Sequence, residues 1–356
     1  MVSLPYVLMA ICGLGSVIAV YLAIVERDLL KAAIISAIQS TLYAFLYYLL
    51  MAPDIVLTYI PVAVGLYPAV ILFLIKKTER YEDVETRPSV AVAVGLSATV
   101  LVISLAIAVA FGGLGPLPPM DVRSLAYTYL VTTYNPMKPV ISALAPEGVT
   151  AIVWDYRGLD TVFETAVLFL AIIGSVAIMR GVEKLKFEEV GVGLTVIGKT
   201  VTRLTIPMIV GVAISIALHG HLTPGGGFQG GATLAIAPLI VLVMFSRLYL
   251  EKLGVTKDRM LVLRSIGLLG VGATAVAVLI AALLTGGSAY ILQNQVRVGS
   301  PYSMPSMLDG IPLGGTLLYF NIFEALAVAA GFTLLFLLLS IPEEVVRKVV
   351  VGEEHG

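Results

Sequence analysis

The chain has 356 residues, of which 59% are hydrophobic and only 13% are charged, and its formal net charge is −1. A soluble globular domain carries about 25% charged residues, so lipid rather than water is the predicted solvent of this chain. The near-zero net charge does not favour a nucleic-acid partner, and the single cysteine excludes an intrachain disulfide. The N-terminal MVSLPYVLMA has no basic start, so no cleavable signal peptide is expected.

Nine stretches of the sequence reach the length of about 20 apolar residues that a membrane-spanning helix needs. We therefore predict an all-α polytopic membrane protein with about nine transmembrane helices. In chain order the predicted spans are 5–25, 30–50, 54–75, 89–111, 161–179, 200–219, 228–250, 262–284 and 317–341.

Lysine and arginine are unevenly distributed among the segments that join these spans. With the N-terminus outside, 18 of the 22 basic residues fall on the inner side, Arg264 among them. Because cytoplasmic segments are enriched in Lys and Arg, we expect a multi-pass protein of the cell membrane with its N-terminus outside and its C-terminus inside.

Two highly charged stretches, 76–88 and 180–193, divide the spans into groups. We expect three parts: 1–80 with three helices, 81–190 with two helices and a long outer loop, and 191–356 with four helices.

The second and third spans carry polar and helix-bending residues. Asp54 begins the third span, and Pro61 and Pro68 remove backbone hydrogen bonds within it. Broken helices recur at transport sites, and a polar stripe joins helices or lines a water path. Asp54 and Gln39 are therefore candidate ion-path residues. The polar stripe on the second span consists of Ser36, Gln39, Ser40, Tyr43 and Tyr47.

The long outer loop 112–160 leads into the fifth span. Its aromatic residues suit the membrane–water boundary, and its strand-like run GVTAIVWDYR (148–157) predicts a loop folded onto the surface. Asp160 and Glu164 follow, four residues apart and therefore on one helix face. Asp160 also suits a helix N-cap, whereas Glu164 lies one turn deeper, and both are candidate ion-path residues.

GLTVIGKT (193–200) matches the phosphate-loop pattern letter by letter. A phosphate loop needs a buried strand that delivers a glycine-rich turn to a helix N-terminus. Here the glycines are separated by bulky residues, the preceding segment is charged, and a membrane span follows, so we interpret the match as chance. Lys199 is expected to anchor the span at the lipid headgroups and is kept as a candidate ion-path residue.

HGHLTPGGGFQGG (219–231) separates the sixth and seventh spans. A zinc site needs three or four ligands, and the third histidine, His355, is expected at the opposite membrane face, so a metal site is not favoured. We expect a helix hairpin in which Gly220 forms a left-handed C-cap and Phe228 begins the next helix. Its six glycines exceed what a turn needs, which predicts close backbone packing. His219, at the helix end, is a further candidate ion-path residue.

Glu324 is the eighth residue of the last predicted span, about 10 Å below the outer surface at 1.5 Å per residue. Charges inside a membrane are costly and mark functional sites by default. Glu324 should therefore face a neighbouring helix or a wet cavity, either as a hydrogen-bonded neutral acid or as a group that moves protons or ions.

Three stretches together resemble subunits of Mrp-type multisubunit cation/proton antiporters. HGHLTPGGGFQGG is similar to the signature of the B subunit. VWDYRGLDTVFETAVLFLAIIG (153–174) and ERDLLKAAIISAIQSTLYAFLYYLLMAPDIVLTYIPVAVGL (26–66) resemble the C-terminal part of the large A subunit. Equivalent pieces occur as small separate subunits in archaeal membrane-bound hydrogenase and sulfane-sulfur reductase complexes, whereas here they are fused in the same order.

The resemblance implies an integral membrane subunit of an Mrp-type Na⁺/H⁺ antiporter module within a respiratory complex related to complex I. It implies large antiporter-like membrane subunits and a hydrogenase-like peripheral arm as partners, besides membrane lipid. Iron–sulfur clusters and a metal centre would belong to those partners, because this chain carries no cluster, haem or nucleotide motif and is expected to hold no cofactor itself.

One position departs from the family pattern. Tyr59 follows APDIVLT where the family carries an acid, and tyrosine is uncharged near neutral pH, so an ion path through that position would be altered. The residues that match the pattern are Asp54, Asp155, Arg157, Asp160 and Glu164. Three alternatives stay open: a scaffold that bridges membrane modules and transports nothing, a subunit of a stand-alone antiporter without a redox arm, and an ATP-driven or metal transporter.

The predicted orientation can be tested by cysteine labelling in a Cys12→Ser background. With the N-terminus outside, a cysteine at Thr223 should react with an impermeant maleimide added to intact cells, and one at Thr256 should react only after the membrane is opened. The reverse labelling pattern would overturn the orientation.

Overall fold

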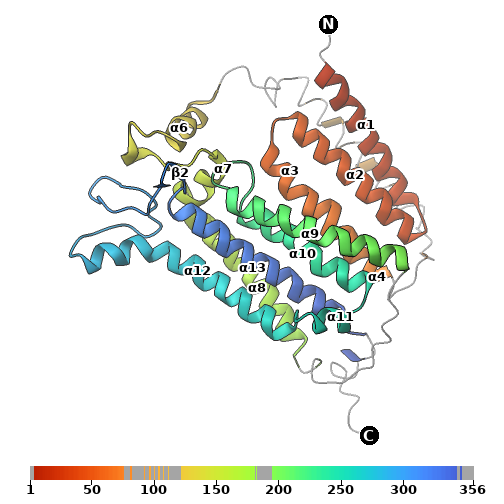
Figure 1. The fold of residues 1–356 in the computed structure, drawn as a ribbon. Helices are drawn as coiled ribbons and strands as arrows, with labels where there is room; N and C mark the ends of the chain where they lie inside the picture. The colour runs from red at the N-terminus through yellow and green to blue at the C-terminus, as the bar shows by residue number, and fades with distance from the viewer. Residues whose placement is uncertain are drawn as a thin grey trace.

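The computed structural model describes residues 4–75, 122–180 and 195–342, together with a few isolated residues outside these ranges (Figure 1). Within the described residues, eight helices are long and apolar enough to cross a membrane. The prediction of an all-α polytopic membrane protein is confirmed. The predicted span 89–111 lies outside the described residues, as do nearly all of the two charged stretches 76–88 and 180–193, so the number nine and the orientation stay predictions.

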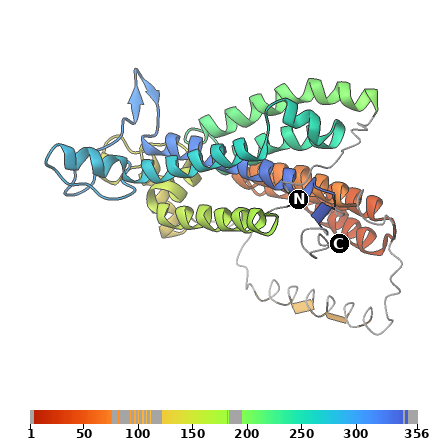
Figure 2. The ribbon, with the colours of Figure 1, turned by 90° about the horizontal axis from the view of Figure 1, so that it is seen from below.

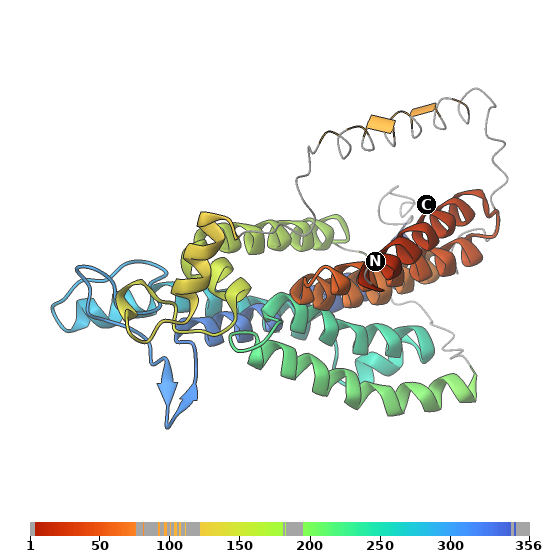
Figure 3. The same ribbon diagram turned by 90° about the horizontal axis from the view of Figure 1, so that it is seen from above.

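The first three spans are α1 (Leu4–Val25), α2 (Leu29–Leu49) and a third that consists of α3 (Pro53–Tyr59), η1 (Ile60–Leu66) and α4 (Tyr67–Ile75). The later spans are α8 (Gly158–Ile178), α9 (Val196–His219), α10 (Gly227–Met244), α12 (Lys257–Leu284) and α13 (Thr316–Leu339). Shorter helices are α6 (Ser124–Thr133), η2 (Pro139–Ile141), α7 (Gly148–Ala151), η3 (Ile152–Tyr156) and α11 (Arg247–Lys252). The strands β1 (Met307–Leu308) and β2 (Ile311–Pro312) pair antiparallel, with Met307 opposite Pro312, and this hairpin projects from the bundle (Figure 3).

α13 is the central helix. It packs against α8, α9, α10 and α12, and Figure 2 shows it between α8 on one side and α9 on the other. The buried share of the span is 67% in α13 and 11% in α1. A helix that is apolar all round belongs in a core, so α13 forms the core, whereas α1 presents its apolar surface to lipid or to another chain.

Glycines allow the backbones of neighbouring helices to pack closely against α13. A Cβ added to Gly231 of α10 would lie 2.7 Å from the carbonyl oxygen of Ala325 and from Cβ of Val328. A Cβ at Gly267 of α12 would lie 2.6 Å from the backbone nitrogen of Ala327. Small residues at such contacts allow the close packing that holds membrane helices together, so the predicted close backbone packing of the glycine-rich stretch is confirmed.

The third span is interrupted where prolines were expected to bend it. Pro61 lies in η1, a π-helical segment between two α-helical ones. Proline lacks a backbone donor and collides with the preceding turn, and a π-helical turn is a common way to absorb such a defect. A Cβ on Gly65 of η1 would lie 3.0 Å from Cδ1 of Ile236, so this segment packs closely on α10.

Segment 148–157 is helical, and the expectation of a strand-like run was wrong. α7 continues directly into the π-helical η3. The Glu147 carboxylate accepts hydrogen bonds from the backbone N–H groups of Val149 and Thr150 and so caps α7. Trp154 on η3 is buried. Capping and the burial of one large side chain outweigh the β propensity of the run.

Two further local expectations were wrong. Gly220 has right-handed dihedral angles, φ −60° and ψ −15°, and the positive φ values fall at Gly225 (146°) and Gly226 (149°). The chain therefore reverses direction at Gly225 and Gly226, in the second half of the glycine-rich stretch. The seventh span ends at Met244 instead of residue 250, because Ser246 accepts a hydrogen bond from the backbone N–H of Tyr249 and starts a separate short helix.

Arg264 lies within α12 and is buried, with 2% of its surface exposed. It does not belong with the cations of the inner loops, where the sequence analysis counted it. Without Arg264, the inner side still carries most of the basic residues, so the expected orientation is unchanged.

The close packing at Gly231 predicts a large difference in stability between two Gly→Ala variants. Gly231→Ala should destabilise the purified chain by about 1–3 kcal/mol, because the added methyl overlaps α13. Gly272→Ala on α12 has nothing within 4 Å of the new methyl and should gain about 0.5–1 kcal/mol from the removal of a mid-helix glycine. Equal thermal unfolding curves for the two variants would contradict the packing.

Candidate functional site

A polar cavity of about 210 Å³ lies where the glycine-rich turn meets α8, α13 and segment 149–154. We call it the carboxylate cavity. Two carboxylates line it, Glu164 from α8 and Glu324 from α13. The remaining lining residues are Thr58, Val149, Thr150, Val153, Trp154, Thr161, Gly225, Gly226, Gly227, Phe228, Gln229 and Asn321.

Glu324 is buried among protein groups, with 9% of its surface exposed. Its carboxylate faces the backbone N–H of Phe228 and the indole of Trp154. A Cβ on Gly227 would overlap the Glu324 side chain, so the glycine is what admits the carboxyl group. Phe228 is the second residue of α10, so Glu324 lies at the N-terminus of that helix, where negative charge is favoured.

Asn321 lies one turn before Glu324 on the same face of α13. It is 1% exposed, and neither Oδ1 nor Nδ2 has a hydrogen-bond partner. Buried polar atoms are nearly always bonded, so the cavity wall has unused hydrogen-bonding capacity beside its buried acid. Asn321 was not among the sequence candidates, although its spacing of three from Glu324 on a largely apolar helix was a usable signal.

Glu164, from α8, also lines the cavity and is exposed. The cavity therefore holds one buried and one accessible carboxylate. Asp160 does not line the cavity: its Oδ2 pairs with Nη2 of Arg157 at 2.5 Å, and its side chain is 60% exposed. Asp160 suits an N-cap by its residue type, but α8 begins at Gly158 with Arg157 in the cap position; Arg157, with φ −129° and ψ 30°, separates η3 from α8.

Two acids outside the cavity hold the glycine-rich turn. Oδ1 of Asp54, at the start of α3, accepts a hydrogen bond from the backbone N–H of Gly225 at 3.0 Å. The backbone N–H of Glu147 donates to the carbonyl of His221 at 3.2 Å, and the Thr150 hydroxyl donates to the carbonyl of Gly220 at 2.5 Å. Burial raises the pKa of Glu147, opposed by the amides that its carboxylate accepts from. Glu147 was also missed by the sequence analysis.

The two histidines of the turn have separate partners. Nδ1 of His219 lies 3.0 Å from the carbonyl oxygen of Ser215, and Nε2 of His221 lies 3.0 Å from that of Pro312. Burial lowers the pKa of His221, which favours its neutral form. Among the described residues, no group of three or more His, Cys, Asp or Glu side chains is arranged to hold a metal ion.

The other sequence candidates lie away from the cavity. Lys199, on the first turn of α9, has its Nζ 5.9 Å from the ring centroid of Phe245, and Gln39 is half-buried on α2. Tyr59, in the place of the family acid, packs edge-on against Tyr43 and Tyr47 at centroid distances of 6.5 and 5.4 Å.

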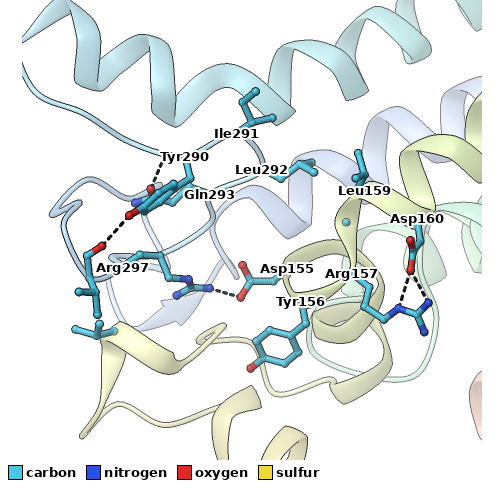
Figure 4. A pocket seen from close by; sticks show the side chains of 13 residues that line it. Asp155, Tyr156, Arg157, Leu159, Asp160, Tyr290, Ile291, Leu292, Gln293 and Arg297 are labelled. Carbon is cyan, nitrogen blue, oxygen red and sulfur yellow. Dashed lines mark hydrogen bonds and ion pairs between the residues drawn. The ribbon is translucent and has the colours of Figure 1, made fainter.

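A second, wider crevice of about 660 Å³ lies beside the N-terminus of α8 (Figure 4). In it, Nη2 of Arg297 bonds to Oδ2 of Asp155 at 2.6 Å, and Nη1 of Arg297 donates to the carbonyl of Ser142 at 3.2 Å. Burial raises the pKa of Asp155 to about 6, and the charge of Arg297 opposes this rise. The pair ties the loop before α13 to η3, which carries Trp154 to the wall of the carboxylate cavity.

Carboxylate, hydroxyl and amide side chains line part of the carboxylate cavity, and their oxygen atoms are ligands of hard cations and acceptors of protons. The arrangement can bind and release a cation or a proton.

Two family models match the sequence. A domain related to the MnhB subunit of the Na⁺/H⁺ antiporter matches residues 197–334, and MbhD, the D subunit of MBH, matches residues 14–80. Two uncharacterised proteins of Methanocaldococcus jannaschii are similar to parts of the chain. One is 29% identical over 230 residues, 59% of this chain and 83% of that protein. The other is 34% identical over 61 residues, 17% of this chain and 77% of that protein.

Among solved structures, a chain of the Mrp complex from Dietzia sp. DQ12-45-1b matches with a TM-score of 0.70 and 19% identity over 94% of this chain. The match spans only 35% of the Dietzia chain, and it shows a shared fold. A chain of the membrane-bound sulfane sulfur reductase, an archaeal respiratory membrane complex, matches with a TM-score of 0.46 and 25% identity over 69% of this chain and 96% of that one.

The two family matches lie at the ends of the chain in the order expected from the sequence, and each falls on membrane spans. The chain is therefore a multi-pass membrane protein that joins an MbhD-like segment, residues 14–80, to an MnhB-related domain, residues 197–334, in one polypeptide.

Proposed function

We propose that this chain is a membrane subunit of an Mrp-type Na⁺/H⁺ antiporter module in a respiratory complex, and that its carboxylate cavity forms part of the ion translocation path. The observation that carries this proposal is the buried Glu324, which lies in the MnhB-related domain, near unpaired Asn321 and in the same cavity as the exposed Glu164. Burying an acid in a membrane span costs free energy, and such acids mark functional sites by default.

The geometry supports a stepwise role for the two acids. Glu164 is exposed and can exchange an ion or proton with the surroundings of the bundle, whereas Glu324 is held in a fixed position by α10. Asn321 offers both a donor and an acceptor at the cavity wall. An ion that passes from Glu164 to Glu324 therefore meets polar groups on both sides.

The partners under this proposal are other membrane subunits, including large antiporter-like ones. The apolar and largely exposed surface of α1 is suited to such a contact. Iron–sulfur clusters and a metal centre would belong to a hydrogenase-like peripheral arm, and a stand-alone antiporter would lack that arm. Identifying the subunits that copurify with the chain separates the two kinds of complex.

A scaffold function is the second candidate, and one observation favours it locally. Tyr59 takes the place of the family acid and packs with Tyr43 and Tyr47. Aromatic contacts of this kind stabilise helix packing. On this view the chain bridges membrane modules and transports nothing itself.

Neutral substitutions of the two cavity acids test the proposal. Glu324→Gln keeps the size and hydrogen bonding of the side chain but cannot titrate, so it should lower Na⁺- or H⁺-gradient formation in energised vesicles on the order of 100-fold, the low end for a proton-transferring group. Glu164→Gln should act in the same direction.

Asp160→Asn is the matched control, because Asp160 is exposed and lies outside the cavity; it should leave transport within about twofold of the wild type, as is usual for an exposed ion pair. Subunit content is measured for each complex. The scaffold function would be established instead if the Glu324→Gln and Glu164→Gln complexes both assemble fully and both transport normally.

A further inference from the structure

Arg264 is a buried charged residue that has no part in the proposed function. Arg264 is the eighth residue of α12, about 10 Å along the helix from its N-terminal end at 1.5 Å per residue. It is 2% exposed. A buried arginine at this depth is expensive in a membrane protein and is retained for a reason.

The guanidinium of Arg264 has no acid partner among the described residues. Nη2 donates to the carbonyl of Phe169 on α8 at 3.0 Å, and the group stacks 4.3 Å from the centroid of the Phe169 ring. Nη1 has no hydrogen-bond partner. A carbonyl and a ring face orient the cation without neutralising it, and arginine keeps its charge in proteins.

Arg264 lies behind the carboxylate cavity. Its Cδ would be 3.7 Å from a Cβ on Gly331 of α13, and Gly331 follows Glu324 by two helical turns, about 10 Å along the same face. Ile172 of α8, which is 1% exposed, packs against α13 at this level: a Cβ on Gly331 would lie 2.5 Å from Cδ1 of Ile172. Buried apolar packing at Ile172 and the charge of Arg264 therefore lie two helical turns of α13 beyond Glu324.

We propose that Arg264 is an electrostatic barrier that stops cations in the carboxylate cavity from crossing the membrane along the contact between α8 and α13. The proposal rests on the proposed function, in which cations reach Glu324. A positive charge in a low-dielectric interior repels cations strongly, and arginines exclude cations from membrane pores in this way. A cation at Glu324 then leaves through a neighbouring subunit or returns.

The test is passive leak in sealed vesicles that contain the assembled complex and no energising substrate. A Na⁺ gradient or a pH gradient is imposed, and its decay is followed with an ion-sensitive dye. Arg264→Gln should speed the decay about tenfold, the effect of a modest loss of barrier height. Arg264→Lys keeps the charge and should remain as tight as the wild type. An assembled Arg264→Gln complex that holds both gradients like the wild type overturns the proposal.

The double variant Arg264→Gln/Glu324→Gln separates this proposal from the proposed function. If the leak passes through the carboxylate cavity, the second substitution should reduce it; an unchanged leak overturns the barrier at this place. Failure of the proposed function appears separately, as normal energised transport by Glu324→Gln alone.

Ile172→Glu covers the case in which Arg264→Gln does not assemble. It leaves the guanidinium and its bond to Phe169 in place but adds an opposite charge beside it. A leak in this variant supports the barrier, and a tight membrane overturns it.

Discussion

The contact between the first turn of α10 and the middle of α13 is the constraint on which the rest of the structure depends. Gly227 has no side chain, and only for that reason can the Glu324 carboxyl group lie against the start of α10. Gly231, one turn further on, repeats the close approach at Ala325 and Val328. The glycines that allow the two helices to pack closely therefore also place the buried Glu324 at the N-terminus of α10, where negative charge is favoured.

This arrangement is held from outside by polar contacts of long sequence separation. Asp54 fixes the turn from the third span, and Thr150 fixes it from α7. The ion pair between buried Asp155 and partly exposed Arg297 fixes the segment that carries Trp154, whose ring stacks on Phe320 of α13 at a centroid distance of 4.2 Å. Breaking one partner of a buried ion pair leaves an uncompensated charge, so these contacts make the position of the cavity wall sensitive to residues far from it.

Hydropathy and the cost of buried charge predicted much of this from the sequence. The spans followed from composition because a membrane allows few alternatives to an apolar helix, and Glu324 stood out because a charge in such a helix is rare. Asn321 was missed because an uncharged polar residue carries a weaker signal. The bond between Asp54 and Gly225 was beyond sequence reasoning, since 171 residues separate them and no local pattern encodes a contact of that range.

That bond also has a consequence for assembly. Asp54 lies in the segment matched by the MbhD model, and Gly225 lies in the domain matched by the MnhB model. Between separate polypeptides such a contact would form and dissociate with their concentrations. On one polypeptide the covalent link supplies a high effective concentration and fixes the stoichiometry at one to one. A weak contact is then enough to keep the two parts in register, so the surfaces that meet at Asp54 and Gly225 do not need a high affinity for each other.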